Sequence, residues 1–121
     1  MAKPEIPTLF VHWESFLGWL LDHTEKFPKH LRFTLTGRID NLALDIYTRI
    51  VEARYRRDRI ALLERINLDL ELLRLLLRLA HDRRVLDHRS FAHACESIDT
   101  TGRMVGGWLR QQKGGVHGPA A

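Results

Sequence analysis

The chain has 121 residues, 45% of them hydrophobic, and a formal net charge of +4, which supports one domain with its own core. Its single cysteine, Cys95, excludes a disulfide framework and a thiolate metal cluster. The basic residues are 15 arginines and 4 lysines, and arginine makes bidentate bonds to phosphate and carboxylate, so the charge points to an anionic partner.

The N-terminal segment argues against export and membrane insertion. Residues 1–7 contain an acid and two prolines where a signal peptide would have an apolar run. No stretch reaches the ~18 uninterrupted apolar residues of a membrane span. We therefore expect a flexible N-terminus over residues 1–7, a cytoplasmic protein and no membrane partner.

Two helices are predicted in the first half of the chain. The first covers residues 8–26, where apolar residues recur at helical spacing and Thr8 is the expected N-cap. Pro28 separates the two, because it disfavours a helical Phe27 and is tolerated in the first turn of a new helix. The second helix covers residues 28–55. Its apolar stripe consists of Leu31, Leu35, Ile39, Leu42, Ile46, Ile50 and Ala53.

The second helix closes with segment 54–59, which carries four arginines against one aspartate. Cations near a helix C-terminus are stabilised by the negative end of the helix dipole. Four exceed what a cap requires, so this cluster is a candidate for binding nucleic acid or a protein partner. Its members are Arg54, Arg56, Arg57 and Arg59.

A third helix, predicted over residues 58–83, has more apolar surface than one core can use. Its apolar residues cover roughly 240° of the circumference, whereas a surface helix needs little more than ~100°. Asp69 and Arg65 are the only interruptions of this arc. The polar residues form one ribbon of about 80°. The ribbon consists of Glu64, Asn67, Glu71, Arg74 and Arg78.

The polar ribbon has two interpretations. If copies of the same chain bury the surplus leucines, Arg74 and Arg78 face a space shared by the subunits. A ring then repeats each arginine, so a charge of +4 per chain becomes a strong field for phosphates or an acidic protein surface. The alternative is an ordinary solvated helix surface, with ion pairs such as Glu71 and Arg74 three residues apart.

A fourth helix is expected from the N-cap Asp87 to about Gln111. Leu86 and Phe91 occupy the two positions of a hydrophobic staple at its start. Residues 113–121 have no core-forming pattern and are predicted to be a disordered tail.

Three glycines, Gly102, Gly106 and Gly107, stand in the interior of this fourth helix. Glycine costs a helix interior about 1 kcal/mol relative to alanine. We therefore expect the close approach of a neighbouring helix at these positions.

No strand pattern competes with the helices, so the predicted fold is all-α. Four helices of similar length with short links indicate an up-down-up-down four-helix bundle over residues 8–112.

No catalytic, metal or cofactor site is predicted. No two of the seven histidines lie three or four residues apart, so no pair shares a helix face as a zinc site requires. No serine lies in a Gly-x-Ser-x-Gly elbow. Arg83 and His88 have a spacing similar to the Arg…His motif of HEPN-type helical RNases, but they straddle the predicted loop.

Four segments, in this order, resemble one protein family. They are Phe27-Pro-Lys followed by Leu31-Arg-Phe-Thr-Leu and Gly37-Arg-Ile, then Glu52-Ala-Arg-Tyr, Leu73-Arg-Leu-Leu-Leu-Arg-Leu-Ala, and Gly102-Arg-Met-Val-Gly-Gly-Trp-Leu. The family is the accessory variability determinant (Avd) of bacterial diversity-generating retroelements. Helical proteins encoded in ribosomal-RNA intervening sequences share its fold. The similarity covers about residues 9–111.

The resemblance implies a non-enzymatic four-helix bundle that assembles as a pentameric ring with a positively charged funnel. Such proteins bind the retroelement's reverse transcriptase and its template RNA, and they support mutagenic retrohoming. The alternative within the resemblance is an intervening-sequence protein that binds nucleic acid or protein and has no reverse transcriptase partner.

The motifs also imply partner-binding residues. Arg74 and Arg78 match the arginines of the family's Leu-Arg-x-x-Leu-Arg-Leu segment, and Arg32 and Arg38 fall in the Arg-Phe-Thr-Leu-x-x-Arg-Ile segment. In the Gly-Arg-x-x-Gly-Gly-Trp segment, Arg103 is the one residue expected to contact a partner. The partner expected for these arginines is RNA, DNA or the polymerase.

Overall fold

The computed structural model describes residues 5–117, which form four long helices and no strand. None of these helices is both long and apolar enough to cross a membrane. A 3-10 turn (Lys29–Leu31) and a π-helix (Arg32–Thr36) precede the second long helix. The long helices are α1 (Glu5–Thr24), α2 (Gly37–Tyr55), α3 (Ile60–Asp82) and α4 (His88–His117).

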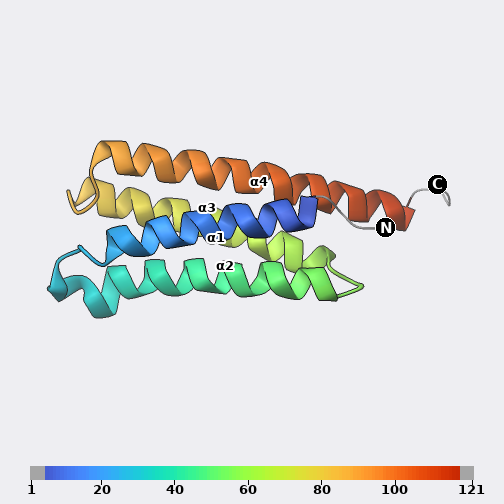
Figure 1. Cartoon of the computed structure of the whole chain (residues 1–121), viewed down its shortest axis with the longest axis horizontal. Helices are drawn as coiled ribbons and strands as arrows, with labels where there is room; N and C mark the ends of the chain where they lie inside the picture. Colours follow the sequence, from blue (N-terminus) through green and yellow to red (C-terminus); the bar gives the residue numbers. More distant parts are fainter. Residues whose placement is uncertain (1–4, 118–121) are drawn as a thin grey trace.

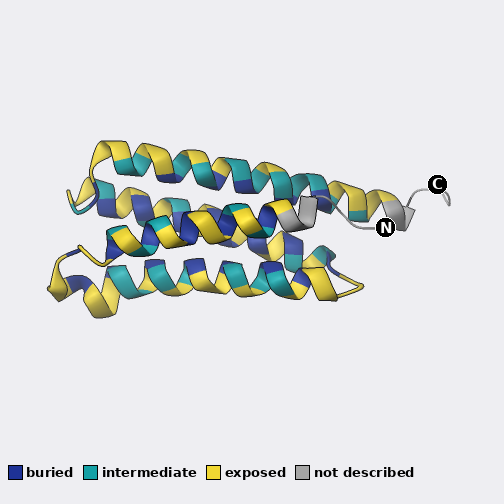
Figure 2. Ribbon diagram, in the orientation of Figure 1, coloured by how far each residue is buried: buried dark blue, intermediate teal, exposed yellow. Residues whose placement is uncertain are grey.

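Each long helix packs against the next one along the chain, and α4 returns to pack on α1. Figure 1 shows the four helices lying side by side, with the start of α1 and the end of α4 at the same end of the molecule. The inward faces are buried and the outward faces exposed (Figure 2). The largest fully buried side chains include Trp13, Leu20, Ile46, Leu63, Leu73, Ile98 and Trp108.

Helix α1 begins at Glu5, so the predicted N-cap at Thr8 is wrong by one turn. Pro7 is the third helical residue, where its missing N–H removes no bond within the helix. The predicted break at Pro28 is confirmed, although α1 already ends at Thr24. The backbone N–H of Phe27 then donates to the Thr24 carbonyl over 3.0 Å.

The prediction of one continuous helix over residues 28–55 is wrong at its start, because the regular helix begins only at Gly37. A Cβ atom at Gly37 would lie 2.9 Å from the carbonyl oxygen of Arg32. Only glycine therefore accommodates the wide π turn that brings this carbonyl against residue 37. Such π turns occur frequently at functional sites.

The one acidic interruption of the α3 apolar arc, Asp69, is buried between α2 and α3 and 2% exposed. Its Oδ2 accepts from Nη1 of Arg49 on α2 over 2.5 Å, and its Oδ1 accepts from Nε of Arg65 over 3.1 Å. The carboxylate is thus bonded on both oxygens, as a buried charge requires. This three-residue network holds α2 and α3 in register.

Helix α4 begins at His88, and the predicted N-cap is confirmed because the Ser90 N–H donates to Oδ1 of Asp87 over 2.7 Å. The predicted end near Gln111 is wrong, since the helix continues to His117. The ammonium of Lys113 lies 3.2 Å from the carboxylate of Glu64 on α3, which ties this extension to the neighbouring helix. The rest of the predicted tail, residues 118–121, and residues 1–4 lie outside the described residues.

Removal of the buried carboxylate should destabilise the fold. We expect Asp69→Ala to lower the free energy of unfolding by about 2–3 kcal/mol, because two arginines lose their shared acceptor while retaining some access to water. Urea denaturation followed by circular dichroism measures this change. Arg65→Ala, whose side chain is 57% exposed, should cost less than about 1 kcal/mol. Equal losses from the two variants would contradict the central role of Asp69.

The stability that the Asp87 N-cap gives to α4 should depend on pH. The Ser90 backbone N–H, with the Ser90 side chain, holds the pKa of the Asp87 carboxyl below its ordinary value. The ionised form therefore stabilises the fold above about pH 4, and this stabilisation is lost as the pH falls through the lowered pKa. Asp87→Ala should lower the melting temperature at pH 7, and the difference from the parent should shrink at acid pH.

The matched control for the cap is Asp87→Asn, which retains a cap that does not titrate. Its melting temperature should depend less on pH between pH 5 and pH 2 than that of the parent. An Asp87→Ala difference that stays constant over this range would refute the stabilising charge at this carboxylate.

Candidate functional site

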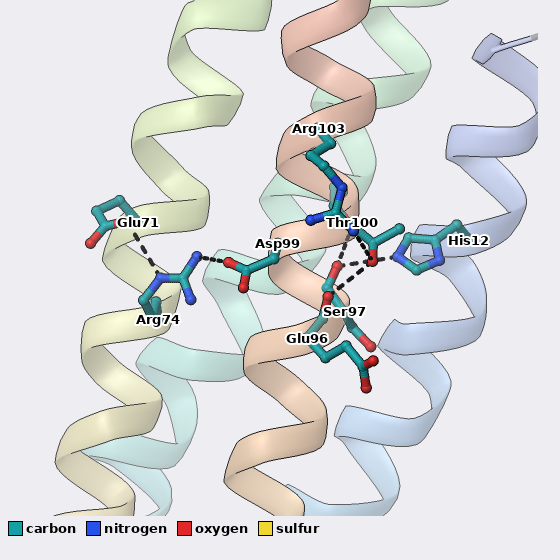
Figure 3. A network of polar contacts seen from close by, with 9 residues as sticks. His12, Glu71, Arg74, Glu96, Ser97, Asp99, Thr100 and Arg103 are labelled. Atoms are coloured by element: carbon teal, nitrogen blue, oxygen red, sulfur yellow. Dashed lines mark hydrogen bonds and ion pairs between the residues drawn. The ribbon is translucent and has the colours of Figure 1, made fainter.

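The polar ribbon of α3 faces α4 across a groove of about 580 Å³. Figure 3 shows Glu71 and Arg74 on α3 opposite Asp99 on α4, with Arg103 one turn further along α4. The residues that line the groove are Asn67, Leu70, Glu71, Arg74, Ile98, Asp99, Gly102, Arg103, Gly106 and Arg110. Three arginines and two carboxylates therefore meet in one concave surface.

Arg74 is held inside this groove by two carboxylates. Its Nη2 donates to Oδ1 of Asp99 over 2.5 Å, and its Nε lies 3.5 Å from Oε1 of Glu71. Burial by itself would lower the pKa of the Arg74 guanidinium, but the hydrogen bond and charge of Asp99, together with the charge of Glu71, raise it. Both acids reduce the charge that Arg74 presents to an external anion.

The side of α4 that faces α1 positions Arg103. Because a carbonyl oxygen only accepts, Nε2 of His12 donates to the Ser97 carbonyl over 3.2 Å. Oγ1 of Thr100 donates to the Glu96 carbonyl over 3.0 Å and accepts from Nη2 of Arg103 over 3.2 Å (Figure 3). The Arg103 guanidinium is thus placed at the groove without a carboxylate partner among the described residues.

Gly102 and Gly106 of α4 line the groove, and none of the three glycines closely approaches a neighbouring helix, so that prediction is wrong within the chain. An added Cβ at Gly102 would meet nothing within 4 Å. At Gly106 it would lie 3.6 Å from Nη1 of Arg110, and at Gly107 3.9 Å from Nη2 of the same side chain. The missing side chains therefore leave the helix surface open and allow the Arg110 guanidinium to lie along it.

The other arginines implied by the motifs lie elsewhere. Arg78 is exposed one turn beyond Arg74 on α3. Arg32, on the π-helix, lines a separate pocket at the turn between α1 and α2. Arg38 lines a third depression together with Phe33 and Arg83. The structure therefore does not gather the predicted arginines into one site.

The cluster at residues 54–59 is divided by the fold. Arg59 is only 8% exposed, and its Nε and Nη2 donate to the Arg56 carbonyl over 2.9 and 2.6 Å. Its guanidinium also lies 5.1 Å from the ring centroid of Trp108. Arg59 is therefore enclosed by the loop that it holds together and is not part of an accessible basic surface. The accessible members are Arg54, Arg56 and Arg57.

The prediction that one core cannot cover the apolar arc of α3 is confirmed. Four leucines, which we name the leucine strip, remain 43–63% exposed. They are Leu68, Leu72, Leu75 and Leu79. Leu79 also lines the depression that contains Phe33, which is 92% exposed on the π-helix. The strip therefore continues toward the α1–α2 end of the molecule.

Two exposed residues of these surfaces were missed by the sequence analysis. Arg110 lies one helical turn after Gly106, a spacing that places both on the same face of α4 and could have identified it. Phe33 is 92% exposed on the π-helix, and it was assigned to no surface from the sequence.

The arginine and histidine of the RNase hypothesis, Arg83 and His88, lie on either side of a loop, as predicted. Arg83 follows the last residue of α3, and His88 is the first residue of α4. Both are exposed, and the His88 ring contacts His81, with centroids 5.7 Å apart. No interaction joins Arg83 and His88 in the described structure, so the geometry does not support this pair as a catalytic site.

Comparison with known families identifies the chain over most of its length. The bAvd-like family matches residues 9–112, in agreement with the resemblance carried by the four motifs. No curated protein and no solved structure matches the chain. The chain belongs to the bAvd-like family, and this membership suggests an accessory protein of diversity-generating retroelements.

Proposed function

We propose, from its membership of the bAvd-like family, that this chain is a non-enzymatic, cytoplasmic accessory protein of a diversity-generating retroelement. It binds the reverse transcriptase and the template RNA through a basic surface and supports mutagenic retrohoming. Its helices form an up-down-up-down four-helix bundle, and its copies assemble into a pentameric ring. The observation that carries this proposal is that α3 presents an exposed leucine strip beside an arginine-lined groove.

The leucine strip supports assembly from copies of the same chain. Its members recur after four, three and four residues, the spacing of an apolar seam between packed helices. They lie on the side of α3 away from its buried residues and are too exposed to contribute fully to the core. A second copy that covers the strip would remove four leucine side chains from water, which is favourable in proportion to the apolar area buried.

The groove supports binding of an anionic partner. Arg74 is neutralised by Glu71 and Asp99, whereas Arg103 and Arg110 make no ion pair within the described part of the chain. Their guanidinium groups can therefore form bidentate bonds to phosphate or carboxylate. The open helix surface at Gly102 and Gly106 lets a polymer backbone come close to α4.

Disruption of the leucine strip should dissociate the assembly. Light scattering of the parent should give several times the chain mass of 14.1 kDa. Leu72→Lys/Leu79→Lys should reduce the mass to that of one or two chains while the helical circular dichroism spectrum is retained, because buried ammonium groups oppose association. The control is Val11→Lys, a more exposed apolar position on α1, which should keep the parent mass. A monomeric parent at micromolar concentration would refute the ring.

Neutralisation of the groove should weaken binding of a labelled single-stranded RNA. We expect Arg103→Gln/Arg110→Gln to reduce the affinity about tenfold or more, and to lower the slope of log K against log salt by about 2, because two phosphate contacts are lost. Fluorescence anisotropy at several salt concentrations measures both quantities.

The matched control removes the same charge at the loop between α2 and α3. Arg56→Gln/Arg57→Gln should leave the RNA affinity within about twofold of the parent if the groove provides the phosphate contacts. If both double variants lost the same RNA affinity, binding would depend on net charge alone, and the groove would not be the binding site. The same two variants, assayed for association with the reverse transcriptase, test the polymerase surface separately.

A further inference from the structure

A second pocket, separate from the groove, lies at the turn between α1 and α2. Its volume is about 630 Å³, within the range of small-molecule sites. The turn, the 3-10 segment and the π-helix all contribute to its lining, so its shape depends on backbone that departs from a regular α-helix. Of the residues that the motifs implicate in partner binding, only Arg32 lines this pocket, and the binding proposed for the groove does not use it.

The less exposed polar groups of the pocket are a carboxyl and two hydroxyls. Oγ1 of Thr24 donates to Oδ1 of Asp40 over 2.7 Å. Burial raises the pKa of the Asp40 carboxyl, and the Thr24 hydrogen bond opposes this only in part. The Thr36 hydroxyl oxygen is buried and has no hydrogen-bond partner among the described residues. An unpaired buried hydroxyl is unfavourable and therefore calls for an explanation.

The exposed part of the lining is strongly cationic. Lys26, Lys29 and Arg32 lie three residues apart along the turn and the start of the π-helix, and all three are exposed. None of them makes an ion pair within residues 5–117. Glu25 is the one exposed acid of the lining. Three positive side chains around one concavity favour a phosphate group.

A bare phosphate would not bond to Asp40, because an ionised carboxylate repels an anion and offers no hydrogen-bond donor. The ligand must therefore carry neutral N–H or O–H donors at some distance from its charged end. Phe27, which is 8% exposed, and Pro28, which is exposed, add apolar lining, and Pro28 offers the accessible surface on which a flat ring can pack. An anionic group, hydrogen-bond donors and a flat ring occur together in a nucleoside phosphate.

We propose that this pocket binds a nucleoside phosphate. The phosphate lies against the three cations, and a hydroxyl or amino group of the nucleoside bonds to Asp40 and Thr36. A change of the Thr36 side-chain rotamer turns its hydroxyl to the ligand. The proposal does not rest on retroelement function, since the pocket is lined by none of the groove residues.

Isothermal titration calorimetry of the full chain tests this proposal. The probes are the four ribonucleoside monophosphates, ribose 5-phosphate, inorganic phosphate and a short RNA with or without a 5′-phosphate. Saturable binding of at least one monophosphate, tighter than ribose 5-phosphate and inorganic phosphate, is the expected result. Binding of the 5′-phosphorylated RNA alone would assign the same chemistry to an RNA end. No saturable binding, or equal affinity for all the phosphates, would overturn the proposal.

Two variants separate ligand binding from a structural role. Thr36→Val should weaken nucleotide binding about fivefold, the loss of one hydrogen bond, while the melting temperature stays equal or rises because the unpaired hydroxyl is gone. Arg32→Gln should weaken binding about tenfold, since a charged contact to phosphate is lost.

The matched controls lie away from the pocket. Thr48→Val alters an exposed α2 threonine whose hydroxyl donates to the Leu44 carbonyl, and Arg57→Gln removes an exposed charge at the other end of α2. Both should bind the nucleotide as the parent does. Parent-like affinity in Thr36→Val and Arg32→Gln would place any observed binding outside this pocket and refute the assignment.

Discussion

Helix α3 carries more apolar surface than its neighbours can cover, and the other surfaces of the molecule are arranged around this excess. Its inner face, which includes Leu63, Leu73 and Leu77, is fully buried in the core. Toward α2 the apolar arc is interrupted by Asp69, whose two arginine partners fix the α2–α3 register. Beyond this network lies the exposed leucine strip, and on the opposite side lies the groove shared with α4. One helix therefore contributes to the core, to the proposed assembly surface and to the proposed binding surface.

The arginines have different electrostatic roles although each counts equally in the net charge. Arg49 and Arg65 neutralise a buried carboxylate, and Arg59 satisfies backbone carbonyls inside a loop. Paired and enclosed charges contribute little field beyond a Debye length of about 8–10 Å. Arg103 and Arg110 have no such partner in the described chain, so their charge is the least compensated of the groove arginines.

The sequence predicted what depends on local spacing and missed what depends on contacts between distant residues. The helices, the Asp87 cap and the surplus leucines of α3 follow from a repeat of 3.6 residues and from one local hydrogen bond. Asp69 could be recognised only as an interruption, because its partner Arg49 lies 20 residues away on another helix. The glycines of α4 were assigned to helix packing because sequence alone does not show whether an open face meets a helix or a groove.

The π turn is the clearest case in which a local feature escaped the pattern, and it also determines the surface at this end of the molecule. Leu31, just before the π-helix, and Leu35, within it, both stay buried, so the apolar stripe alone resembles that of a regular helix. At about 100° per residue, a regular helix would also direct residue 33 away from the face that carries Leu31 and Leu35, so the exposure of Phe33 does not reveal the π turn. Phe33 is 92% exposed there, and Arg32 belongs to the cationic lining of the pocket. A regular helix would tolerate alanine at position 37 and gain about 1 kcal/mol from it. Glycine at this position is therefore explained by the close approach of the Arg32 carbonyl in the π turn, and not by the stability of the helix.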